Sequence, residues 1–233
     1  MGTRWSLPNS LGACKTPAAL RALGRHASLE TVLASLAGEL GASDHLIVHD
    51  TVEGLSRALA DVGPDPVVQL GALGDRVGAA LSVQGPGLER PRSYDDLRPD
   101  VVLGRLAGDE LVLAASLAAI GRRAGFDVDV MLGARHALVA HHGIAAPLVL
   151  SLRRESRTID AGDLDDELRW ADPHDVAAAL VGRLDARAAL LRDVPMRTRA
   201  IELALAVPGD RPERRALLAS PRGSPALATT SPA

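Results

Sequence analysis

The 233-residue sequence predicts an α+β protein, in which a helical N-terminal part precedes a buried helix and an antiparallel sheet. Two observations lead to this prediction. Hydrophobic residues make up 47% of the chain and charged residues 24%, the balance of a globular protein with a sizeable core. The apolar spacing also changes from a helical period to a strand period after Gly125. Helices followed by strands that share one core form an α+β layout.

The chain is expected to begin with a flexible leader and then a helical subdomain. Residues 1–27 mix glycine, proline, serine and arginine without sustained periodicity, which is typical of a leader. From Ser28 onward apolar residues return every three or four positions, and Gly41 follows as a stop. The pattern predicts a first helix between these two residues and a helical subdomain over residues 28–84.

Two more helices are predicted within this subdomain. The helical spacing recurs over residues 49–63 and, more weakly, over residues 66–81. Residues 85–100 are then rich in turn-forming and charged residues. We therefore expect a connector and a domain boundary there.

The most apolar segment is a helix predicted over residues 109–124. Asp109 is a suitable N-cap, and Gly125 follows as the stop. The interior of the helix, residues 111–115, is apolar on nearly all sides. Such a helix is normally buried in the middle of a domain.

Strands and then helices are predicted beyond Gly125. Alternating apolar and polar residues predict the strands, and helical spacing returns in the last two segments. The predicted strands cover residues 126–132, 136–140, 147–152 and 157–160, and the predicted helices cover 172–193 and 196–207. The core with its C-terminal helices thus spans residues 101–208. The Pro-, Ser- and Thr-rich residues 209–233 are expected to be partly disordered.

The composition argues against several classes of function. Aromatic residues make up 2% of the chain and the net charge is -3, which does not suit a nucleic-acid surface of stacking rings and basic side chains. A single cysteine, Cys14, allows neither an internal disulfide nor a multi-cysteine metal site. The sequence has no dinucleotide or phosphate-binding motif, and no long apolar run. We therefore expect a cytoplasmic protein, with no cofactor and no membrane span, and its arginine-rich composition is typical of GC-rich bacterial genomes.

Two pairs of histidines are candidates for metal ligands. His45 and His49 have helical spacing but lack the intervening glutamate of a zinc hydrolase. His141 and His142 are neighbours on a predicted strand, so their side chains point to opposite faces. Both pairs are expected to face solvent, and no metal site is predicted.

The order of a few residues around the buried helix resembles a known family. The segment that starts at Gly108 reads GDEL, Gly125 closes the helix, and His136 and Asp160 follow in strands. This order is similar to the transglutaminase-like superfamily, in which a Gly-x-Cys motif opens the helix and a histidine and an aspartate follow. The closer resemblance is to the SirB-type branch, which often has proline in place of the cysteine. Here Glu110 stands in that place.

The resemblance implies a transglutaminase-like, papain-like core with a site at the start of the buried helix. In a working member the helix dipole favours the thiolate, and the histidine and aspartate raise its reactivity. Because a carboxylate is a poor acyl nucleophile at neutral pH, Glu110 predicts a degenerate, non-catalytic protein that binds or regulates an unidentified partner protein. The alternative is a hydrolase or acyl transferase that uses Glu110, His136 and Asp160.

Each of these residues also has a purely structural interpretation. Glu110 is a first-turn residue that suits the helix dipole, and His136 is a core or strand-edge histidine. Asp160 is equally suited to form a turn. The basic pair Arg153 and Arg154 is interpreted as an ordinary solvated surface.

Overall fold

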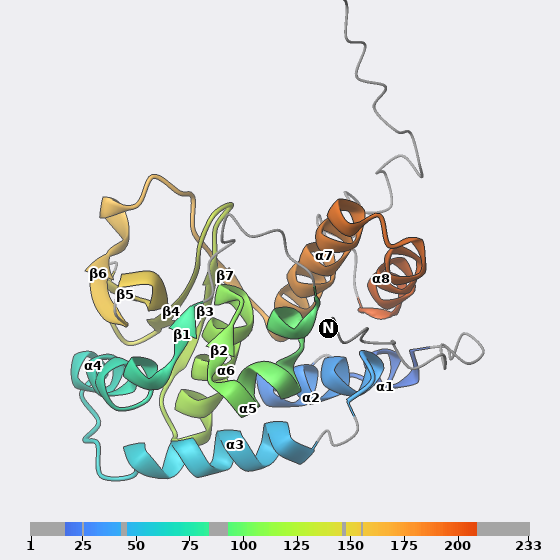
Figure 1. Ribbon diagram of the computed structural model, residues 1–233. Coiled ribbons are helices and arrows are strands. Elements are labelled where there is room, and N and C mark those ends of the chain that lie inside the picture. The colour runs from blue at the N-terminus through green and yellow to red at the C-terminus, as the bar shows by residue number, and fades with distance from the viewer. Residues whose placement is uncertain are drawn as a thin grey trace, which may run out of the picture.

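The computed structural model describes residues 17–24, 26–42, 46–83, 93–145, 148–154 and 156–208. Its mixture of helices and an antiparallel sheet agrees with the predicted α+β class (Figure 1). The α-helices are α1 (Ala18–Arg21), α2 (Leu29–Glu39), α3 (Leu46–Ser56), α4 (Pro66–Arg76), α5 (Pro99–Arg105), α6 (Glu110–Arg123), α7 (Pro173–Leu191) and α8 (Val194–Ala206). The strands are β1 (Ser82–Val83), β2 (Ala107–Gly108), β3 (Val128–Leu132), β4 (Ala137–His141), β5 (Leu148–Ser151), β6 (Arg157–Asp160) and β7 (Arg169–Ala171). Short 3₁₀ turns are η1 (Arg57–Leu59), η2 (Gly78–Ala80), η3 (Asp95–Leu97), η4 (Leu152–Arg154) and η5 (Ala161–Asp163).

Strands β3 to β7 form one antiparallel sheet with the spatial order β6, β5, β4, β3, β7. Strands β4 and β5 pair antiparallel, with Val139 of β4 opposite Leu150 of β5. The sequence analysis missed β7, in which Ala171 lies opposite Val130 of β3. Three residues are too few to show an alternating pattern.

Helix α6 lies at the centre of the core. Asp109 accepts a hydrogen bond from the backbone N–H of Leu111 at 2.8 Å, which confirms the predicted N-cap. Gly125 follows the helix with φ +88°, a conformation that favours glycine. A Cβ atom on Gly121 would lie 2.6 Å from Cγ2 of Val128, so the helix and β3 pack at very close range. The helix also contacts α2, α3, α5 and β4, which explains why it is apolar nearly all round.

Both faces of the sheet are covered at β4. Side chains alternate between the two faces of a strand, so Val139 is buried in the main core and Leu138 in a second, smaller cluster. Leu164 and Leu168, from the segment between β6 and β7, pack against this second cluster. Every residue of β4 is therefore buried.

The N-terminal helices pack directly against α6. Both α2 and α3 contact it, and Leu33 and Val52 belong to the same core as Leu113 of α6. The predicted first helix is confirmed as α2, with the Ser28 side chain accepting a hydrogen bond from the backbone N–H of Thr31 at 3.1 Å. The second helix begins at Leu46 instead of residue 49 and ends in the turn η1.

The segment expected to be a connector contains regular structure. Its last residues enter η3 and α5, and Leu106 ends α5 with φ +52°. Strand β2 then pairs in parallel with β1, with Ser82 opposite Ala107. The N-terminal helices are thus joined to the start of α6 by a ladder as well as by packing.

Several sequence predictions fall on residues outside the described part of the chain. These are most of the leader, with Cys14, the C-terminal residues 209–233, and His45. Within the described residues, no helix is both long and apolar enough to cross a bilayer.

Candidate functional site

Glu110 is the first residue of α6, and its side chain is buried at the end of the sheet. The residue is 2% exposed. Its Oε2 accepts a hydrogen bond from Nε of Arg153 at 2.7 Å, while Oε1 is buried and has no hydrogen-bond partner. An unpaired buried polar atom costs about 1 to 3 kcal/mol of stability. Such a cost marks this carboxylate as a candidate functional group.

Arg153 lies in the turn η4, which directly follows β5. The pairing of Val139 with Leu150 places the residues after β5 next to the start of β4. The Arg153 side chain is 43% exposed, so its inner edge meets Glu110 and its outer part faces solvent. The sequence interpretation of Arg153 as part of a solvated surface agrees with this exposure, but it did not include the bond to Glu110.

The pKa of Glu110 is raised from its ordinary value of 4.5. Burial is the main cause, because a charged carboxylate loses its hydration. The charges of Arg153, His136 and Arg183 act in the opposite direction and do not cancel the effect of burial. The fold therefore keeps the Glu110 carboxylate in an environment that disfavours its charged form.

His136 lies immediately before β4. Its charge lowers the pKa of both Glu110 and Asp166. Asp166 accepts hydrogen bonds from the backbone N–H groups of Ala134 at 2.8 Å and Arg135 at 2.9 Å. Asp166 thus fixes the turn that carries His136.

The pKa of Asp166 is lowered from its ordinary value of 3.8. Burial raises it, but the backbone N–H groups of Arg135, Ala134 and His136 and the charge of His136 outweigh burial. Asp166 was not singled out in the sequence. It lies in an acidic run, and only its position across from the β3–β4 turn distinguishes it.

Asp160 does not join the other two predicted site residues. Asp160 is exposed and is the last residue of β6, where it lies opposite Leu148 of β5. Its side chain accepts a hydrogen bond from the backbone N–H of Gly162 at 2.8 Å. Ser151, the residue nearest η4, lies opposite Arg157 at the other end of the same strand pair. Asp160 therefore forms a turn at the end of the strand pair that lies away from Glu110 and Arg153.

A second ion pair connects the start of α6 to α7. The carboxylate of Asp109, which caps α6, also pairs with Nη1 of Arg183. Sequence reasoning missed Arg183 because the two residues are 74 positions apart. The first turn of α6 therefore carries two carboxylates, each held by an arginine from another element.

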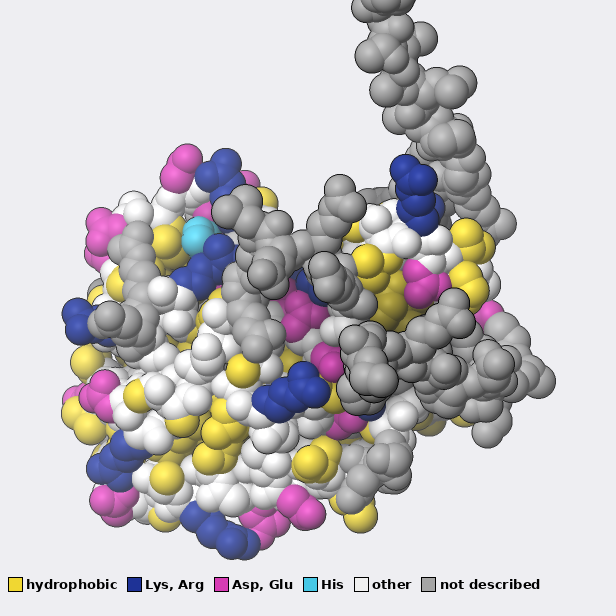
Figure 2. Space-filling model, in the orientation of Figure 1, with side chains coloured by type: hydrophobic (Ala, Val, Ile, Leu, Met, Phe, Trp, Pro, Cys, Tyr) yellow, Lys and Arg dark blue, Asp and Glu magenta, His cyan; other side chains and the backbone are white. Residues whose placement is uncertain are grey.

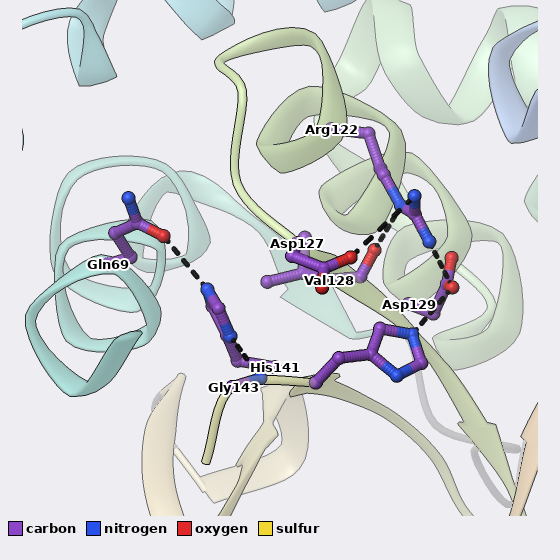
Figure 3. Close-up of polar contacts among 8 residues, drawn as sticks. Gln69, Arg122, Asp127, Val128, Asp129, His141 and Gly143 are labelled. Carbon is purple, nitrogen blue, oxygen red and sulfur yellow. Dashed lines mark hydrogen bonds and ion pairs between the residues drawn. The ribbon is translucent and has the colours of Figure 1, made fainter. Parts of the chain in front are cut away.

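The other end of β4 carries a second polar cluster (Figure 3). His141 is 5% exposed; its Nδ1 accepts the backbone N–H of Gly143 at 2.9 Å and its Nε2 lies 2.8 Å from Oε1 of Gln69. Nε2 must therefore carry the proton. Burial lowers the pKa of His141, which favours the neutral ring. The prediction that His141 faces solvent was wrong, because α4 covers this end of the strand.

His142 points to the opposite face, as the strand alternation predicts. Its Nε2 lies 2.9 Å from Oδ2 of Asp129, and its ring stacks on Trp170 with a centroid distance of 4.0 Å. Arg122 pairs with the same Asp129 carboxylate and donates from Nε to the carbonyl of Val128 at 2.7 Å. In the part of the chain that the structure describes, no group of three His, Cys, Asp or Glu side chains is placed to hold a metal ion.

No family model and no curated protein matches the sequence. The transglutaminase-like resemblance therefore stays a prediction from the order of residues. At this end of the sheet the structure shows a buried carboxylate, Glu110, bonded to Arg153.

Proposed function

We propose that this protein is a non-catalytic interaction module built on a transglutaminase-like core, which binds or regulates a partner protein. The observation that carries the proposal is the state of Glu110. The residue stands where the resemblance places a nucleophilic thiolate, and its carboxylate is buried and bonded to Arg153. The ordered set of residues that underlies the resemblance adds support.

The same observation weakens the alternative of a carboxylate-based hydrolase or transferase. A nucleophile must reach the substrate and be activated by a neighbouring base. Oε1 of Glu110 is inaccessible to solvent, and Oε2 is engaged by an arginine, which lowers its nucleophilicity. Asp160, the expected orienting group, lies at the far end of the β5–β6 pair.

A paired experiment tests the proposal. Purified protein is incubated with p-nitrophenyl acetate and with an amide substrate, beside the variants Glu110→Gln and His136→Ala. We expect the three proteins to show the same background rate. Turnover by the natural protein that disappears in both variants would establish the alternative instead.

The interaction role needs its own measurement. The natural chain, immobilised and exposed to a lysate of its source, should retain a partner in stoichiometric amount. Crosslinking before lysis controls for contacts formed afterwards. A chain that is monomeric and retains no partner under both conditions would contradict an interaction module.

A further inference from the structure

Residues 161–168 join the two edge strands of the sheet and cross its second face. Because the spatial order is β6, β5, β4, β3, β7, the chain that leaves β6 must pass three strands before it enters β7. Figure 1 shows this segment as the gold loop between β6 and β7. Its Leu164 and Leu168 pack against the buried residues of the second cluster, which are Leu138, Ala140 and Val149. We call residues 161–168 the strap.

The strap is long enough that chain tension does not hold it against the sheet. Its two ends are separated by four strand spacings, a distance of roughly 19 Å. The stretch from Asp160 to Arg169 can span about 30 Å when it is fully extended. Closure therefore depends on the contacts of the strap and not on its length.

A single carboxylate ties the strap to the sheet. Oδ1 of Asp166 accepts the backbone N–H of Ala134 and Oδ2 accepts that of Arg135, so each oxygen has its own donor. Within the described residues, the other acidic side chains of the strap make no hydrogen bond or ion pair, and all are exposed: Asp163, Asp165 and Glu167. In Figure 2, acidic side chains stand out at the upper left, where Figure 1 draws the strap. Asp166 is thus distinguished from its acidic neighbours by its contacts.

The turn that receives Asp166 is shaped for a carboxylate. Successive backbone N–H groups that point to one side form a small concave anion site, or nest. Here the N–H groups of Ala134 and Arg135 form the nest, and the Asp166 carboxylate fills it. A Cβ atom on Gly133 would collide with this carboxylate, so a glycine at this position leaves room for it. The β3–β4 turn and the strap are therefore fitted to each other.

We infer that the strap is a latched cover, held shut by Asp166 in the nest and able to open from the second face of the sheet. Leu164 and Leu168 lie two residues before and after Asp166, so one carboxylate anchors the strap between its two apolar contacts. Both leucines stay partly exposed, so releasing them costs less than releasing core leucines. The inference goes beyond the proposed function and stands on these contacts alone. The chain itself occupies this face when the strap is closed.

The test measures how fast a thiol reagent reaches each face of β4 in the folded protein. Ala140→Cys places a thiol in the second cluster, and Ala137→Cys places one in the main core on the same strand. Both are made in the full chain with Cys14→Ser, so that only the new thiol reacts. We expect Ala140→Cys to react at least about tenfold faster, because opening the strap requires less than unfolding the core. Equal rates would contradict a strap that opens separately.

A matched pair of variants isolates the latch. Asp166→Asn removes the charge and leaves one acceptor for two N–H groups, so we expect labelling of Ala140→Cys to rise about tenfold and labelling of Ala137→Cys to stay unchanged. Asp165→Asn is the control, since it makes the same change in charge on an exposed neighbour. It should change neither rate. Equal rises in the two asparagine variants, or a rise at both cysteines, would overturn the latch.

A free carboxylate tests the nest without the strap. Asp166→Gly empties the nest, and formate should then slow amide exchange at Ala134 and Arg135 more than chloride does at the same ionic strength. Formate with no more effect than chloride would contradict a carboxylate-binding nest. If the cysteine variants do not fold, amide exchange at these two positions in Asp166→Asn and Asp165→Asn decides, and equal exchange would overturn the latch. Acyl turnover would remove the proposed function alone, whereas these outcomes remove only the latch.

Discussion

The two ends of β4 carry two histidine sites that differ in how completely their polar atoms are paired. At the C-terminal end of β4, both ring nitrogens of His141 have partners, in Gln69 and the backbone of Gly143. Near the N-terminal end of β4, one carboxylate oxygen of Glu110 is buried without a hydrogen-bond partner. The first cluster has the properties of a structural network, and the second contains a buried acceptor without a donor.

The difference shows that burial of a polar residue says little until its bonds are counted. His141 and Glu110 are both buried. Burial lowers the pKa of His141 and raises the pKa of Glu110, so it favours the neutral form of each. For His141 the neutral form fits its two hydrogen bonds. For Glu110 the neutral form would weaken its bond to Arg153, so burial and pairing oppose each other. The following substitutions break each end of the strand in turn.

Arg153→Gln should have the largest effect. It leaves the buried Glu110 carboxylate without its cation, and loss of one partner from a buried pair typically costs 3 to 5 kcal/mol. Because Arg153 is half-exposed and water can replace part of it, we expect a loss of about 2 to 3 kcal/mol in urea unfolding at pH 7. Arg76→Gln, equal in exposure but paired with an exposed carboxylate, should cost under about 1 kcal/mol. Equal losses in the two variants would mean that the burial of Glu110 does not strengthen the effect of removing its partner.

Gln69→Met should have the next largest effect. The new side chain has similar length but cannot accept the His141 Nε2 proton, and an unmet buried donor costs about 1 to 3 kcal/mol. The exposed neighbour Val68→Ala is the control and should change stability by less than about 0.5 kcal/mol. Unfolding at pH 7 measures both. If the two variants match, the His141 network is not a structural element.

Arg122→Gln should have a smaller effect, because its ion pair with Asp129 lies near the surface on the far face of the sheet. Exposed pairs contribute about 0 to 1 kcal/mol, and salt screens them. We expect a loss within this range that shrinks in 1 M sodium chloride. A loss above about 2 kcal/mol at high salt would show that the hydrogen bond to the Val128 carbonyl, not charge, carries the interaction.

Glu110→Gln should have the smallest effect at pH 7, with stability unchanged or slightly increased. The natural group has a raised pKa in the folded state, so its contribution to stability is fully present below its ordinary value of 4.5 and is lost as pH rises through the folded value. The variant does not titrate at this position. Its stability relative to the natural protein should therefore be highest above the folded pKa and fall as the pH drops.

Unfolding of both proteins between pH 4 and 8 measures this difference. Acid acts on His141 in the opposite direction, because a lowered histidine pKa gives stability that is present above its ordinary value of 6.5 and lost below it. That loss is common to both proteins and cancels in the comparison. A difference that grows as pH falls would contradict the account of Glu110.

The sequence predicted what local periodicity controls and missed what depends on distant partners. Helix α6, with its Asp109 cap and Gly125 stop, follows from spacing and end residues alone. The pairing of Glu110 with Arg153 joins residues 43 positions apart, and it depends on how η4 turns after β5. No single-sequence pattern contains that turn. Strand alternation likewise gave the opposite faces of His141 and His142, but not the helix that covers one of them.

A contact between the two ends of the described chain has a consequence for biosynthesis. Arg199 of α8 pairs with the Glu39 carboxylate at 2.6 Å and donates to the Glu39 carbonyl, across 160 positions. At 5 to 20 residues per second a ribosome needs roughly 8 to 32 s to make that stretch. During this interval the end of α2 has been synthesised but its final neighbour has not. The nascent N-terminal helices therefore lack this contact, and remain within reach of chaperones, until Arg199 has been translated.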